Sequence, residues 1–251
     1  MRAKLISAPY TIWMALFIIV PMGLVVFFAF TDKSGAFTLD NILRVGQYSN
    51  VFLRSIWLGA IATAISLLLG YPLAYTISKM KAKRQSVMIM LVMLPMWMNF
   101  LLRTYAWMSL LEDNGLINNM LAAIGLPRVH MINTAGAVVL GMVYNYIPYM
   151  ILPIYSVLTK IDNSVVLPMS MPGVISGITM VFVPAVSTFI ISKMLGGGGN
   201  LLIGDLIDMQ FLGSAYNPNL GSAISLVLMV IILICMGIMN QFDDGDENMG
   251  G

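Results

Sequence analysis

Long stretches without charged residues constrain this chain more than any other feature of its sequence. The hydrocarbon core of a bilayer is about 30 Å thick, and roughly 20 apolar residues of α-helix are needed to cross it. Long continuous apolar runs predict helices and not barrel strands, in which polar and apolar residues alternate over about ten residues. We therefore predict an all-α integral membrane protein with about six transmembrane helices. The predicted helices are Tyr10–Phe30, Ser55–Ser78, Ser86–Leu111, Ala135–Leu158, Pro172–Met194 and Gly221–Asn240.

The composition agrees with a membrane protein. Hydrophobic residues make up 59% of the 251 residues and charged residues only 10%, whereas soluble domains carry about 25% charged residues. The formal net charge of +2 is small and gives no reason to expect nucleic-acid binding. We expect residues 1–251 to form a single transmembrane domain.

Basic residues in the short loops predict the orientation of the chain. The loop after the second predicted helix has four basic residues and no acid, so we place it in the cytoplasm; these are Lys79, Lys81, Lys83 and Arg84. An even number of crossings then puts both the N- and the C-terminus in the cytoplasm. Arg2 and Lys4 precede the first apolar run as in a signal peptide, but the run is long and lacks a clear cleavage site. We expect an uncleaved first helix.

No motif for covalent chemistry is recognisable in the sequence. The glycine run Gly196–Gly199 is followed by Asn200, so it lacks the lysine of a phosphate-binding P-loop. One cysteine, Cys235, and one histidine, His130, provide no metal cluster. We predict that the protein is not an enzyme, needs no cofactor and binds no metal. If transport is active, another subunit must supply the energy.

Polar and aromatic residues within the third and fourth predicted helices form a candidate solute face. An arginine inside a membrane span usually faces a cavity or a partner, although Arg103 could instead extend to the outer headgroups. An aromatic and polar face suits a cation through cation–π contacts, and hydrogen bonding between helices is the alternative. The candidate pathway residues are Asn99, Arg103, Tyr105, Trp107, Tyr144, Asn145 and Tyr149.

Two further features carry expectations for the structure. Gly173 and Gly177 form a GxxxG pattern at the start of the fifth predicted helix, which allows close helix packing within or between subunits. Four acidic residues in the predicted outer loops could attract a polycation, or they could be solvated loop charges. They are Glu112, Asp113, Asp205 and Asp208.

Several short sequences, in their order and spacing, resemble binding-protein-dependent ABC importer permeases, and among these the spermidine/putrescine permease subunits most. The resemblance runs through nearly the whole chain. It implies a type I ABC importer permease-like fold, a second permease subunit, a cytoplasmic ATPase dimer and an external polyamine-binding protein. The matching stretches are Gly70–Tyr75, Leu94–Trp97, Leu102–Trp107, Asn114–Asn118, Gly141–Tyr149, Ile151–Tyr155, Lys160–Asp162 and Asn200–Gly204.

The chain departs from this family in one segment. Such permeases carry a cytoplasmic loop with a Glu-Ala-Ala…Gly…Ile-x-Leu-Pro pattern, whose short helix fits a groove on the ATPase. Here the Leu-Pro end is present as Leu167 and Pro168, but the Glu-Ala-Ala and the central glycine are not. With Lys160 and Asp162, these two residues are the remnant of the coupling segment. A coupling-deficient permease that acts only as a membrane partner, or a permease for another small solute, therefore remains an alternative.

Overall fold

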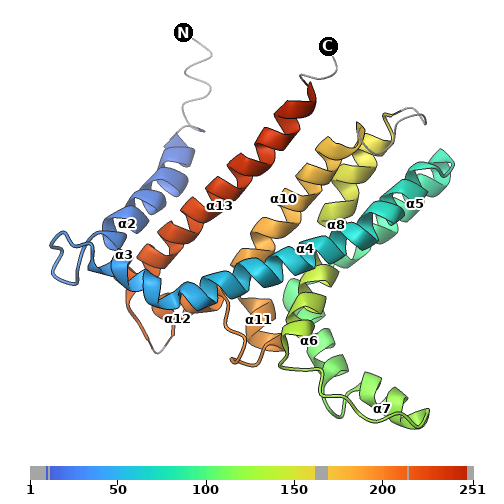
Figure 1. Ribbon diagram of the computed structural model, residues 1–251, viewed down its shortest axis with the longest axis horizontal. Helices are drawn as coiled ribbons and strands as arrows, with labels where there is room; N and C mark the ends of the chain where they lie inside the picture. Colours follow the sequence, from blue (N-terminus) through green and yellow to red (C-terminus); the bar gives the residue numbers. More distant parts are fainter. Residues whose placement is uncertain (1–9, 11, 162–168, 214, 248–251) are drawn as a thin grey trace. The chain divides into compact units, whose positions relative to one another are not determined.

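The computed structural model describes residue 10 and residues 12–161, 169–213 and 215–247 of the chain (Figure 1). These residues form helices joined by loops, and one isolated β-bridge joins Thr31 to Phe37. The chain divides into two compact units. One comprises Met1–Asn50 with Leu206–Ile232, and the other comprises Val51–Asp205 with Leu233–Gly251.

The first unit contains the N-terminal helices and the beginning of the last helix. The π-helix η1 (Ala15–Ile19) continues into α2 (Val20–Ala29), whose side chains are almost all exposed and apolar, as a lipid-facing helix requires. The short helices α3 (Asp40–Val45) and η2 (Gly46–Tyr48) follow a loop. Most of α12 (Ile203–Phe211) and the first part of α13 (Pro218–Glu247) complete this unit.

Two buried asparagines close the C-terminal end of α2, where backbone carbonyls lack partners within the helix. The Asn219 amide donates to the carbonyl oxygens of Thr31 at 2.7 Å and Phe28 at 3.2 Å. The Asn41 amide donates to the Thr31 carbonyl at 2.8 Å and to the Ala29 carbonyl at 3.3 Å. These side chains therefore fasten α3 and α13 to the end of α2.

We expect replacement of Asn219 by alanine to lower the free energy of unfolding by about 1–3 kcal/mol, because the Thr31 and Phe28 carbonyls each lose one of their donors. Thermal unfolding of the purified protein in detergent measures the change. Asn119→Ala is the control, since the exposed Asn119 amide makes only exposed bonds, to the Asn114 carbonyl at 3.1 Å and from Arg128 Nη2 at 3.4 Å. Equal melting temperatures for the two variants would contradict this role of Asn219.

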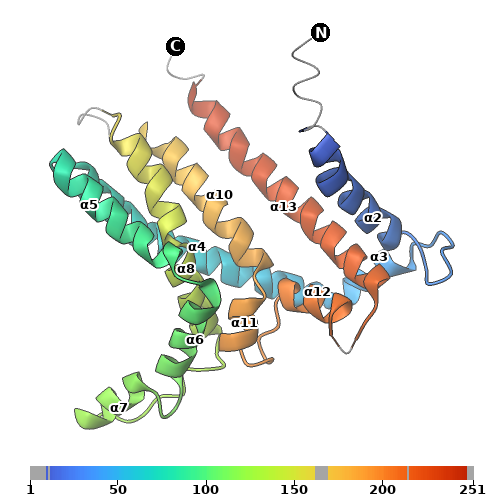
Figure 2. The same cartoon turned by 180° about the vertical axis from the view of Figure 1, so that it is seen from behind.

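The second unit is helical, and α8 and α10 run side by side in it (Figure 2). The helices are α4 (Ser49–Ser78), α5 (Ala82–Met93), the 3₁₀-helix η3 (Leu94–Trp97), α6 (Phe100–Leu111), α7 (Leu116–Ala123), α8 (Ala135–Leu158), α10 (Met171–Ser187) and α11 (Ile190–Leu195). The most extensive contact is between α8 and α10. The predicted GxxxG pattern lies in this contact, and it serves packing within the chain. A Cβ atom at Gly177 would lie 2.8 Å from the Met150 sulfur, and one at Gly173 would lie 3.0 Å from the Pro153 carbonyl oxygen.

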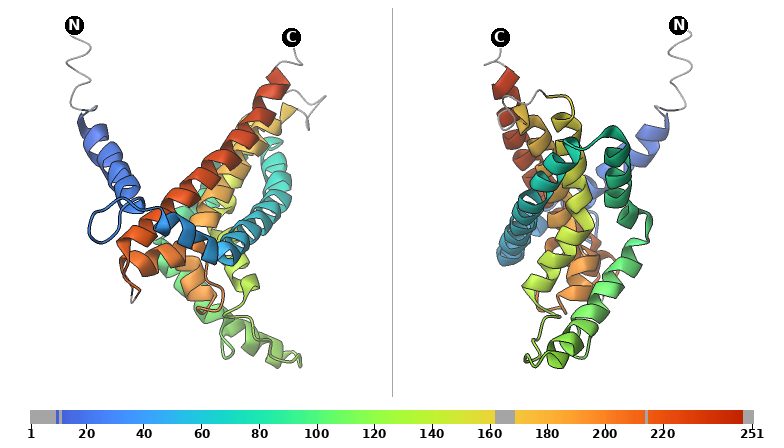
Figure 3. Two further views of the ribbon diagram at one scale, coloured as in Figure 1. Left: turned by 60° about the vertical axis from the view of Figure 1, so that its left-hand side comes forward. Right: turned by 90° about the vertical axis from the view of Figure 1, so that its right-hand side faces the viewer.

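The third predicted helix is broken in the structure. The axis turns by 87° between the segment 82–97 and the segment 100–123 (Figure 3). Pro95 lies in the 3₁₀ turn before the break, and Met98 is extended with a ψ of 147°. The Asn99 side chain then accepts hydrogen bonds from the Leu101 and Leu102 amides at 2.8 and 3.4 Å, and it caps a new helix.

The fifth predicted helix is also shorter than expected. Helix α10 ends at Ser187, Thr188 is extended with a ψ of 143°, and α11 begins at Ile190. Four stretches of the described residues are long and apolar enough to cross a membrane, and the bent pair would make a fifth. The prediction of an all-helical membrane protein is confirmed, with two of its helices interrupted. The four stretches are Ile12–Ala29, Asp40–Ser78, Ala135–Leu158 and Pro218–Met239.

Candidate solute site

An aromatic pair joins α6 to α8 at the centre of the candidate solute face. The rings of Trp107 and Tyr144 meet edge to face, with centroids 5.4 Å apart and an interplanar angle of 70°. Both side chains are half-buried, so part of each ring is accessible from outside the chain. An aromatic face of this kind can attract an ammonium group.

Arg103 lies one turn before Trp107 on α6 and is only 8% exposed. Its guanidinium carbon is 5.9 Å from the centre of the Phe100 ring. Within the described residues, its Nε and Nη1 atoms have no hydrogen-bond acceptor. The Arg103 side chain is therefore covered by the rest of the chain. Buried, unsatisfied donors of a charged group carry a large energetic cost.

Asn145 of α8 is 2% exposed and contributes a second incompletely satisfied polar group. Its amide nitrogen donates to the Gly141 carbonyl at 2.8 Å, whereas its Oδ1 atom has no donor within the described residues. The next residue, Tyr146, is half-buried against the apolar core. The C-terminal parts of the two broken helices, α6 and α11, both contact α8.

The remaining predicted pathway residues have other environments. Asn99 is the cap of α6, and Tyr105 is 54% exposed. Tyr149 is 39% exposed, and its ring centroid lies 6.5 Å from that of Tyr146 on the same helix.

The four predicted outer acids have different environments. Glu112 and Asp113 are exposed at the end of α6, and the Asp113 carboxylate forms an ion pair with His130 at 2.8 Å. Asp208 is half-buried on α12. Asp205 is only 3% exposed, and its Oδ2 atom accepts the Leu202 amide at 2.9 Å. The Asp205 carboxylate therefore serves as a buried local cap and not as a solvated loop charge.

The predicted remnant of the coupling segment lies mostly outside the described residues. This applies to Asp162, Leu167 and Pro168. Lys160 is exposed just after the end of α8, and its amide donates to the Val157 carbonyl at 2.9 Å.

Sequence reasoning missed the two helix breaks. Asn99 before an apolar run, four residues after Pro95, is a helix-start signal that could have revealed the first break. The second break, at Thr188, lies in a largely apolar stretch without a comparable signal.

Comparison with known proteins identifies the family. No family model matches the chain. The spermidine/putrescine transport system permease protein PotB of Haemophilus influenzae is 34% identical, over 88% of this chain and 87% of that protein. This chain belongs to the spermidine/putrescine transport system permease family. PotB of Escherichia coli is 32% identical over 90% of this chain and 91% of its own length. The inner membrane ABC transporter permease protein YdcU of Escherichia coli is 28% identical over 81% of this chain and 75% of its own length.

Solved structures support the same architecture. A chain of the bacterial alginate ABC transporter, in complex with alginate pentasaccharide-bound periplasmic protein, superimposes with a TM-score of 0.75 at 19% identity. That match covers 95% of this chain and 92% of the other. A second structure, of a bacterial ABC transporter for import of the acidic polysaccharide alginate, gives a TM-score of 0.71 at 20% identity, covering 100% and 97%. The fold is therefore that of an ABC importer permease, and the chain is a multi-pass permease subunit of the cell membrane.

Proposed function

We propose that this permease subunit forms half of a pathway for polyamines. The carrying observation is the edge-to-face pairing of Trp107 with Tyr144. The next residue of α8, Asn145, adds a buried Oδ1 atom, an acceptor with no donor in the described part of the chain. Aromatic faces and a neutral acceptor suit an ammonium group. The family membership supports the same substrate class, because the PotB relatives are named for spermidine and putrescine transport.

A second permease subunit, a cytoplasmic ATPase dimer and an external binding protein would complete the transporter. The chain itself would perform no catalysis, and its movements would follow ATP binding to the partner subunits. Such a switch needs a part of the permease that has two conformations, and binding of the ATPase must favour one of them. Two interrupted helices, broken near Asn99 and Thr188, are suitable elements because each half can move separately.

The substitution Trp107→Leu tests the proposed solute face. We expect it to lower ATP-driven spermidine uptake about thirtyfold, since a desolvated cation–π contact contributes about 2 kcal/mol. Uptake is measured in proteoliposomes that contain the partner subunits and this chain with the family's coupling segment inserted. Trp107→Phe is the matched variant, and it should keep most of the activity because the aromatic face remains. Equal losses in both variants would rule out a cation–π role for Trp107.

The absence of the Glu-Ala-Ala pattern favours a second candidate, a membrane partner that no longer couples to an ATPase. Affinity purification distinguishes it: a folded chain that retains no ATPase subunit supports the second candidate.

A permease for a different small solute is the third possibility. For a polycation pathway, neutralising the exposed Glu112 and Asp113 together should reduce uptake at low salt.

A further inference from the structure

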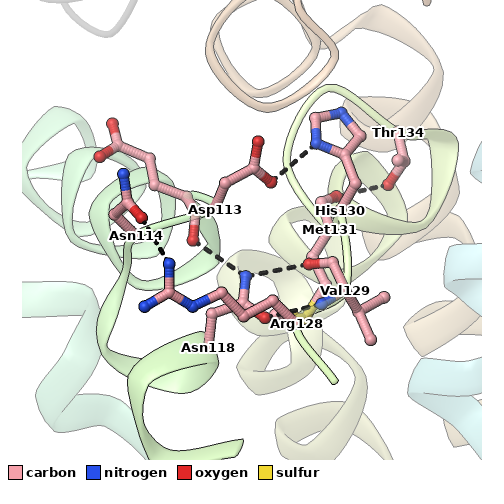
Figure 4. A network of polar contacts seen from close by, with 9 residues as sticks. Asp113, Asn114, Asn118, Arg128, Val129, His130, Met131 and Thr134 are labelled. Atoms are coloured by element: carbon pink, nitrogen blue, oxygen red, sulfur yellow. Dashed lines mark hydrogen bonds and ion pairs between the residues drawn. The ribbon is translucent and has the colours of Figure 1, made fainter. Parts of the chain in front are cut away.

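Helix α7 is held to the N-terminal end of α8 by a network of polar contacts (Figure 4). The fully buried Asn118 accepts the Val129 amide at 2.8 Å and donates to the Val129 carbonyl at 2.9 Å. It also donates to the Glu112 carbonyl at 3.2 Å, and Asp113 pairs with His130 at 2.8 Å. These bonds fix α7 against the segment that leads into α8.

The length of α8 and the residues around its first turn support a membrane surface near this network. Helix α8 has 24 residues and so is about 36 Å long, enough to cross a hydrocarbon core of about 30 Å. Just before it, the Asn133 carbonyl accepts the Asn200 amide at 3.2 Å. The exposed Arg54 donates to the Gly199 carbonyl at 2.9 Å, and the exposed Trp57 lies one turn along α4. An arginine followed by an exposed tryptophan is typical of the membrane–water interface.

The outer face of α7 carries a continuous apolar stripe. Leu116, Met120 and Ile124 are 58%, 63% and 73% exposed, and their spacing of four residues puts them on one side of the helix. No residue of α7 is charged. The buried Asn118 lies on the side that contacts the rest of the chain. A helix with one buried polar side and one exposed aliphatic side needs an apolar environment on the exposed side.

We propose that α7 is an interfacial membrane helix whose stripe of Leu116, Met120 and Ile124 inserts among the acyl chains of the lipid bilayer. The polar network holds α7 against the segment that leads into α8, a helix long enough to cross the hydrocarbon core. The stripe has no aromatic or charged residue, as lipid contact permits, whereas protein interfaces are enriched in aromatic residues and arginine as well as methionine. Lipid contact there anchors α6, the part of the third span beyond the 87° bend.

Site-directed spin labelling of the intact chain tests this assignment. Single cysteines replace Leu116, Met120 or Ile124 in a Cys235→Ser background, and Asn119→Cys is the matched control on the same helix. The chain, with the subunits that co-purify with it, is placed in nanodiscs of phosphatidylcholine and phosphatidylglycerol. Power saturation then compares collisions with oxygen, which concentrates in lipid, and with a water-soluble nickel chelate.

We expect the three stripe positions to favour oxygen over the nickel chelate at least about threefold more than Asn119→Cys does, because apolar stripes of interfacial helices lie below the headgroups. Stripe positions that collide mainly with nickel would place α7 in water and overturn the proposal. Positions protected from both reagents would place the stripe under a protein partner and overturn it as well. The result does not depend on polyamine uptake, so failure here would leave the proposed function untouched.

Discussion

Insertion of the family's coupling segment after Ile161 is expected to raise ATP-driven spermidine uptake by about 10- to 100-fold, the range of a typical coupling free energy between two sites. Between Lys160 and Leu167 the sequence has no Glu-Ala-Ala or glycine of the expected coupling pattern. An ATPase can bias a permease only through contacts that differ between its nucleotide states. We therefore expect the unmodified chain to couple ATP binding only weakly to the membrane helices.

Uptake of radiolabelled spermidine into proteoliposomes measures this effect. A glycine-serine insert of equal length is the control, since it lengthens the loop without forming the coupling helix. Uptake by the unmodified chain that equals uptake by the chain with the restored segment would contradict the prediction. It would mean that the remaining residues near Lys160 already engage the ATPase.

Replacement of Gly177 by leucine is expected to disrupt the packing of α10 on α8 and to lower the free energy of unfolding by about 3 kcal/mol or more. A Cβ atom at this position would already lie 3.1 Å from the Met150 carbonyl oxygen and 2.8 Å from the Met150 sulfur. The backbone cannot retreat easily, because the two helices form the most extensive contact in the unit. We expect a lower melting temperature and a smaller monodisperse fraction in detergent.

Gly237→Leu provides the matched control within the apolar part of α13. A Cβ atom at Gly237 meets nothing within 4 Å, so the same substitution there should be nearly neutral. Thermal unfolding and size-exclusion chromatography of both variants give the comparison. Wild-type stability of Gly177→Leu would contradict the packing assigned to the GxxxG pattern.

The sequence predicted the helical membrane fold well because apolar length is a direct consequence of bilayer thickness. The predicted Ala135–Leu158 coincides with α8, and Ser55–Ser78 lies within α4. The breaks after Met98 and Ser187 were not predicted, because both lie inside apolar stretches that hydropathy treats as continuous. Backbone geometry and side-chain capping decide these breaks, and hydropathy does not report either.

The candidate site was predicted only in part. Trp107, Tyr144 and Asn145 were selected as polar and aromatic residues at membrane depth, and the structure places Trp107 against Tyr144. The exposure of Tyr105 and the burial of Asp205 could not be predicted, because they depend on which helices cover each face. Which side chains pair across two helices depends on tertiary packing, and a single sequence has no periodic pattern that reports these pairs.

The central claim is that this chain forms half of a polyamine pathway. A competition assay of transport tests it most directly. Proteoliposomes contain the chain with the restored coupling segment, its partner permease, the ATPase subunits and the external binding protein. We predict spermidine uptake that requires ATP and the binding protein and that is inhibited by unlabelled putrescine but not by an acidic oligosaccharide. No spermidine uptake by this assembly, under conditions in which another solute is imported, would contradict the claim.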